Sequence, residues 1–203
     1  GFLDREVRPK AVISEDGPEG KALALQIAAE RRQADREEVL MAVRRSGLAL
    51  KYAAEEFRAD REVVRAALAK DWQALAFAAE DLKADQELIL EAIQQDGCAL
   101  DLAAPRLRAD RAIALEAVSK DWQALEYVAG NLTADREVVL AGVRQSGHAL
   151  QHADQELKAD KEVVLTAVSQ DWHALEYAAK EMKADREVLL AAAQQDGRAL
   201  ALA

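Results

Sequence analysis

The sequence has little of what cross-links, turns and membrane spans require. Its single cysteine, Cys98, excludes a disulfide within the chain, and scarce cysteine favours a reducing, intracellular compartment. Three prolines and nine glycines leave few turn positions, and aromatic residues are only 4% of the chain. No apolar run approaches the roughly 20 residues of a membrane-spanning helix, so we expect no membrane partner.

Positive charge is scarce relative to negative charge. The chain has 27 Lys and Arg residues against 37 Asp and Glu residues, which gives a formal net charge of −10. Binding of DNA or RNA requires clustered positive charge that neutralises phosphates, so we expect no nucleic-acid partner. The acidic balance favours solubility.

Residue combinations that support catalysis are also missing. The sequence has no set of nucleophile, base and orienting residue, no glycine-rich phosphate loop and no nucleotide-binding fingerprint. We therefore predict a protein that is not an enzyme and that needs no cofactor.

What the chain does contain is one phrase repeated every 25 residues. Ala-Asp recurs at this spacing up to Asp185, and Ala-Leu recurs at the same spacing up to Leu200. The units are 22–46, 47–71, 72–96, 97–121, 122–146, 147–171 and 172–196, with a partial unit at 197–203. Residues 1–21 echo the repeat imperfectly, so we expect them to form a degenerate N-terminal capping segment.

Each unit contains two positions typical of helix N-caps, where a side-chain oxygen accepts a free backbone N–H. The first caps are Ser46, Asp71, Asp96, Asp121, Ser146, Asp171 and Asp196, and the second are Asp60, Asp85, Asp110, Asp135, Asp160 and Asp185. Two helices of about ten residues per unit are too short to persist alone in water. With the abundance of Ala, Leu and Glu, this predicts an all-α, right-handed α-solenoid of seven 25-residue helix-pair repeats, forming one domain over 22–203.

One column indicates where the first helix of a unit ends. Pro105 and Gly130 occupy it, whereas other units have Glu, Gln or Lys there. Proline inside a helix costs about 3 kcal/mol. Two interpretations remain open at this point: the first helix ends near the column in every unit, or it kinks in the unit of Pro105 alone.

Another column alternates between the largest side chain and the smallest. Its tryptophans are Trp72, Trp122 and Trp172, and the glycines between them are Gly97 and Gly147. A row of aromatic contacts for a ligand is one interpretation. We favour packing, because Trp122 shares a helix face with Leu125 and Ala129 and large side chains interdigitate with small ones between stacked helices. Packing therefore has a 50-residue period.

The repeated phrase resembles a known family. The pattern GxALxxAAxxLxADREVVLAAVxQD is similar to the tandem repeats called domain of unknown function 4116, over about 22–203. That family's unit is about fifty residues, or two 25-residue units. The resemblance implies a helical repeat array, and it supplies no catalytic residue, cofactor or substrate.

Three histidines form the only constellation that suggests a metal. His148 and His152 are four residues apart, and His173 lies in the column of His148 one unit later. A metal- or small-molecule-binding module at these residues is an alternative function. We favour a variable surface, because two helical histidines without a HExxH motif are a weak signal and because other units have Gln or Cys in the same column.

The basic and acidic residues around the second caps also have two interpretations. A strip of helix N-termini could bind anions, or it could be a solvated, self-compensating strip of charges. We favour the latter, because each cap Asp already occupies its helix N-terminus.

These observations favour a non-enzymatic scaffold or spacer that binds an unknown protein partner. The predicted contact surface is the variable column Gln73, Cys98, Gln123, His148, His173 and Arg198. A further alternative is a passive arm of a larger enzyme whose catalytic part lies outside this sequence. The sequence does not indicate an oligomeric state.

Overall fold

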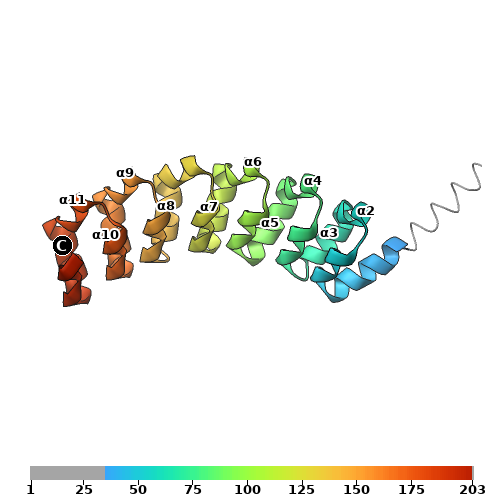
Figure 1. The fold of residues 1–203 in the computed structure, drawn as a ribbon, viewed down its shortest axis with the longest axis horizontal. Helices are drawn as coiled ribbons and strands as arrows, with labels where there is room; N and C mark the ends of the chain where they lie inside the picture. Colours follow the sequence, from blue (N-terminus) through green and yellow to red (C-terminus); the bar gives the residue numbers. More distant parts are fainter. Residues whose placement is uncertain (1–34, 203) are drawn as a thin grey trace, which may run out of the picture.

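A computed structural model describes residues 35–202, and all regular structure in that part of the chain is helical. Short helices follow one another along an elongated, gently curved array (Figure 1). Within residues 35–202, no helix is long and apolar enough to cross a membrane. The predicted capping segment 1–21 and the beginning of unit 22–46 lie outside the described residues.

Each unit from 47–71 onward, the partial unit at 197–203 included, opens with a 3₁₀ helix of five or six residues. These helices are η1 (Gly47–Tyr52), η2 (Trp72–Phe77), η3 (Gly97–Leu102), η4 (Trp122–Glu126), η6 (Gly147–His152), η7 (Trp172–Tyr177) and η8 (Gly197–Leu202). Their first residues are 25 positions apart, as the repeat predicts.

A short helix and a longer helix follow in each of the six units from 47–71 to 172–196. The short helices are α2 (Glu55–Arg58), α4 (Glu80–Lys83), α6 (Pro105–Arg108), η5 (Gly130–Ala134), α9 (Gln155–Lys158) and α11 (Lys180–Lys183). The longer ones are α3 (Arg61–Leu68), α5 (Gln86–Gln95), α7 (Arg111–Lys120), α8 (Arg136–Val143), α10 (Lys161–Gln170) and α12 (Arg186–Gln195). Residues 35–45 are helical too.

The unit therefore has three helices where the sequence predicts a pair. The predicted first helix is divided by two extended residues, such as Ala78 and Ala79 between η2 and α4. The Ala79 N–H donates to the carbonyl of Arg58 in the preceding unit at 2.9 Å. This hydrogen bond between units replaces one inside a helix, which explains how two strong helix formers come to be extended.

Pro105 follows the same rule. It is the first residue of α6, a position where its missing N–H is not needed. The first of the two interpretations, that the opening helix ends before this column in every unit, is confirmed.

The predicted N-caps are present with one exception. Asp85, for example, accepts hydrogen bonds from the backbone N–H groups of Glu87 and Leu88, and Asp121 accepts from that of Gln123. Ser46 forms no side-chain cap hydrogen bond. The cap residues thus mark the helix starts that the sequence indicates.

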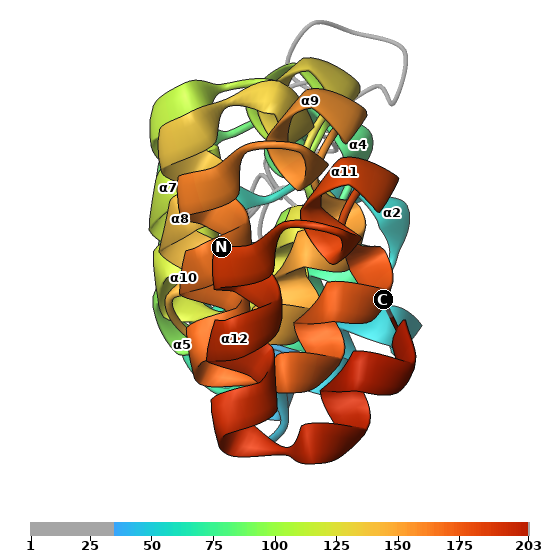
Figure 2. The same cartoon turned by 90° about the vertical axis from the view of Figure 1, so that its left-hand side faces the viewer.

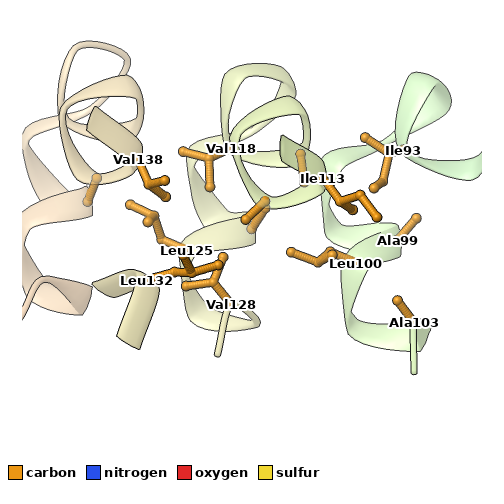
Figure 3. Packing of buried hydrophobic residues seen from close by; sticks show 14 of the residues in the cluster. Ile93, Ala99, Leu100, Ala103, Ile113, Val118, Leu125, Val128, Leu132 and Val138 are labelled. Carbon is orange, nitrogen blue, oxygen red and sulfur yellow. The ribbon is translucent and has the colours of Figure 1, made fainter. Parts of the chain in front are cut away.

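The helices form two layers, and the short helices lie along one edge of these layers. Viewed along the array, the longer helices lie on one side, the 3₁₀ helices lie on the other, and short helices such as α9 and α11 lie along the upper edge (Figure 2). The Leu of each Ala-Leu pair from Leu50 to Leu175 is buried, and Leu100 and Leu125 are almost fully so, whereas Leu200 at the end of the array is 57% exposed. The buried leucine side chains join those of Ile113, Val118 and Val138 in a core that continues from unit to unit (Figure 3).

Candidate functional site

The outer side of the 3₁₀ helices presents an exposed ridge. A 3₁₀ helix has about three residues per turn, so residues i and i+3 lie one above the other. The second and fifth residues of each helix therefore point the same way, as Gln123 and Glu126 do in η4, and both are exposed. The third and fourth residues are the Ala-Leu pair, most of which is buried.

The predicted contact column forms half of this ridge. Gln73, Gln123, His173 and Arg198 are exposed, whereas Cys98 and His148 are partly buried. The structure therefore brings the six predicted residues onto one side of the array, one per unit.

A second column beside the ridge is one that sequence reasoning did not single out. The column occupies the sixth position counted from the first residue of each of these 3₁₀ helices, and its side chains are large. Its members are Tyr52, Phe77, Leu102, Tyr127, His152, Tyr177 and Leu202. All except Tyr52, which is 85% exposed, are partly buried. The signal that could have revealed the column is the same 25-residue spacing that revealed the caps.

The tryptophans also border the ridge, and each is partly buried. The Trp122 ring lies 6.3 Å from the ring of His152 in the following unit. The Trp172 ring stacks on His173 at 3.8 Å. The indoles thus pack on the core and still reach the surface.

The glycines between the tryptophans allow the backbone at the end of the longer helix to approach closely. A Cβ added to Gly97 would lie 2.3 Å from the carbonyl oxygen of Ala117 and 3.0 Å from the backbone nitrogen of Asp121, and the indole is not among its nearest neighbours. No described glycine has a positive φ, so close approach explains the glycine. The nearest atoms around Gly97 thus come from the end of α7 and from Asp121, and the interdigitation of Trp with Gly stays a prediction.

In units that begin with tryptophan, a glutamine side chain connects the start of the 3₁₀ helix to the longer helix of the preceding unit. Gln145 accepts a hydrogen bond from the Trp122 N–H at 3.1 Å and donates to the carbonyl of Val118 at 2.6 Å. Gln195 does the same for Trp172 and Val168. This 50-residue recurrence also escaped sequence reasoning. Two kinds of contact at the start of the 3₁₀ helix therefore alternate along the array. Glycine allows direct backbone contact, whereas tryptophan is accompanied by a glutamine side chain that forms the bridge.

The three histidines are not brought together. In the described part of the chain, they do not form a group whose ligand atoms all lie within 4.8 Å of one another. His148 and His173 lie on either side of Asp171, at 3.5 and 2.7 Å, and His152 turns toward Trp122. In a 3₁₀ helix, residues four apart point about 120° away from each other, which separates His148 from His152.

Asp96, Cys98 and Asp121 are the one group within residues 35–202 whose possible ligand atoms are that close. Both aspartates already cap helices. Burial, together with the charges of Asp121 and Asp96, raises the pKa of Cys98 to about 12, which keeps the thiol protonated and unreactive at neutral pH.

Ion pairs cross from unit to unit along the second caps. Arg111 contacts Asp135 at 2.6 Å and also pairs with Glu137. The same pattern recurs at Arg36 with Asp60 and Glu62, Arg61 with Asp85 and Glu87, Arg136 with Asp160 and Glu162, and Lys161 with Asp185 and Glu187. The predicted strip of charges is thus internally paired. It is interrupted at Asp110, because Gln86 stands where the other units have Arg or Lys, and Ala112 stands where they have Glu.

This pairing predicts a pH-dependent contribution to stability. The Arg111 hydrogen bond, with the N–H of Val138, lowers the pKa of Asp135 below the value of about 3.9 in an unfolded chain. Asp135→Asn keeps the cap oxygen and removes the charge, so it should cost up to about 1 kcal/mol at pH 7. Because the folded-state pKa is the lower one, the difference should be full above the unfolded pKa and should disappear as pH falls through the folded pKa.

Urea unfolding of both proteins between pH 7 and pH 2.5 measures this difference. Asp101→Asn is the matched control, because within residues 35–202 the exposed Asp101 carboxylate joins no ion pair. A difference between Asp135→Asn and the unchanged protein that stays constant across the pH range would contradict the prediction.

A family model described as Domain of unknown function (DUF4116) matches the chain three times in tandem, over residues 35–83, 85–133 and 135–183. Each match contains one glycine-led and one tryptophan-led 3₁₀ helix. Comparisons with curated proteins and with solved structures gave no match.

Proposed function

We propose that this chain, which belongs to the family described as Domain of unknown function (DUF4116), is a non-enzymatic scaffold that holds a protein partner along its 3₁₀ helices. The proposal includes a right-handed α-solenoid geometry for the array. Such arrays present one extended surface built from successive units.

The pattern of variation within the chain carries the proposal. In every unit from 47–71 onward the third and fourth residues of the 3₁₀ helix are Ala and Leu, and most of them are buried. The residue just before them is Leu48, Gln73, Cys98, Gln123, His148, His173 or Arg198. A regular frame thus carries side chains that change from unit to unit at a position that is exposed or partly buried, and such variation suits recognition.

An affinity capture with ridge variants tests the scaffold role. The immobilised chain would be incubated with an extract of the cells that encode it, and retained proteins would be identified by mass spectrometry. The ridge variant is Gln73→Ala, Gln123→Ala and His173→Ala. The matched control is Gln86→Ala, Gln155→Ala and Gln194→Ala, which changes exposed residues on other helices.

The scaffold role predicts that a specific protein is retained by the unchanged chain and by the control, and that the ridge variant retains about tenfold less. Equal retention by all three chains, or no saturable retention at all, would contradict it. Circular dichroism of each variant verifies that the helices are intact.

A further inference from the structure

The 3₁₀ helices from η2 to η7 contain no lysine or arginine. The carboxylates within them or directly before them are Asp71, Asp96, Asp101, Asp121, Glu126, Asp171 and Glu176. Lys158 and Lys183 approach from the short helices, where they donate to the carbonyl oxygens of Gln151 and Glu176 at 2.8 Å. Along its middle this face therefore carries carboxylates, of which Asp101, Glu126 and Glu176 are exposed, and its 3₁₀ helices supply no basic residue of their own.

Aromatic rings border the acidic ridge. Trp122 and Tyr127 belong to η4 or its end, and Trp172 and Tyr177 occupy the matching positions of η7. Burial raises the pKa of Tyr127, and the charges of Glu126 and Asp101 raise it further. Glu126 and Tyr127 are neighbours at the end of η4, so a carboxylate and a ring lie at the same end of this helix.

At both ends of the face the chain supplies its own cation to a ring. The Lys51 ammonium lies 5.8 Å from the Tyr52 ring centroid. The Arg198 guanidinium lies 5.8 Å from the Trp172 ring and contacts Asp196 at 2.6 Å. A cation above an aromatic ring is a favourable contact, and a neighbouring carboxylate strengthens it. The middle units have rings and carboxylates without such a cation from their own 3₁₀ helices.

We propose, building on the scaffold function above, that the partner is an extended protein segment rich in arginine and lysine. Its cations lie over the middle rings and pair with the exposed carboxylates of Asp101, Glu126 and Glu176. Charge complementarity with this acidic face identifies the occupant. Stacked units are about 8–10 Å apart, and an extended chain advances about 3.3 Å per residue, so every third residue of the segment meets a new unit.

Fluorescence anisotropy with a defined peptide tests this inference. The probe is a labelled peptide of four Arg-Gly-Ser repeats, and the matched probe replaces each Arg by Glu. The acid variant of the chain is Asp101→Asn, Glu126→Gln and Glu176→Gln. The control variant, Glu56→Gln, Glu156→Gln and Glu181→Gln, removes the same charge from the short helices.

The Arg peptide is expected to bind at physiological salt, whereas the Glu peptide should not. The acid variant should weaken binding about tenfold or more, and the control variant should weaken it less than about threefold. A second variant, Trp122→Leu, keeps an apolar side chain and should weaken binding of the Arg peptide by about threefold through loss of the ring.

Three results would overturn the inference. They are no binding of the Arg peptide, equal weakening by the acid and control variants, and no effect of Trp122→Leu in a chain with unchanged circular dichroism. Capture of a partner that lacks basic segments, lost in the ridge variant, would overturn the inference while leaving the scaffold function in place. Absence of any ridge-dependent partner would remove the scaffold function itself.

Discussion

Gly97→Ala is expected to lower the free energy of unfolding by about 1–3 kcal/mol, the usual cost of overpacking. The added Cβ would lie 2.3 Å from the carbonyl oxygen of Ala117. That oxygen belongs to the backbone of α7, which accepts the Asp121 N–H, so it cannot move without disturbing a helix end. The start of η3 and the end of α7, which belong to the same unit, would have to separate.

Gly197→Ala is the matched control, because a Cβ at Gly197 would have no heavy atom within 4 Å. Alanine normally favours a helix over glycine by about 0.5–1 kcal/mol, so this variant should be neutral or more stable. Urea unfolding followed by circular dichroism gives the sign, and hydrogen exchange locates the affected units, since repeat arrays need not unfold in one step. Equal effects of the two substitutions would contradict close approach as the reason for glycine.

Leu125→Ala is expected to cost about 2–5 kcal/mol, as deletion of a buried leucine side chain does. Leu125 is 1% exposed, and its Cδ1 occupies the space beside Gly142, 2.5 Å from where a Cβ on that glycine would lie. The cavity would open in the core shared by two units. Leu190→Ala is the control, because Leu190 is 53% exposed, and it should cost well under 1 kcal/mol.

The same cavity permits a rescue. Gly142→Ala added to Leu125→Ala places a methyl group in the vacated space, so the double variant should be more stable than Leu125→Ala alone. Thermal unfolding of the four proteins gives the coupling free energy, expected at about 0.5–3 kcal/mol. Additive losses would show that Leu125 does not fill the space over Gly142.

The caps, the buried pairs and the 25-residue spacing could all be predicted from the sequence, because each rests on local chemistry. Asp85 and Asp121 cap helices through hydrogen bonds to backbone N–H groups two or three residues away, so their role does not depend on the rest of the fold. The Ala-Leu pair is apolar at every recurrence. The division of the first helix could not be predicted. Its cause is a hydrogen bond from Ala79 to Arg58 in another unit, and the residues between η2 and α4 are alanines, which favour helix locally.

The candidate surface was predicted in part. The column that contains Gln123 was identified because its residues vary while its neighbours do not. The constellation of His148 and His152 was judged on α-helical geometry, and a 3₁₀ helix turns the two side chains apart. Tyr127 and its column went unnoticed, because a position held by several kinds of large residue forms no verbatim phrase.

The alternation of glycine-led and tryptophan-led units makes a pair of units the smallest part of the array that repeats in full. A glycine-led unit is shaped to touch backbone, and a tryptophan-led unit is shaped to receive a glutamine, as Gln145 shows. Deleting a single 25-residue unit would place two units of the same kind side by side, whereas deleting a neighbouring pair would keep the alternation of the two kinds. The full structural repeat is therefore a pair of units, which agrees with family matches that begin at residues 35, 85 and 135.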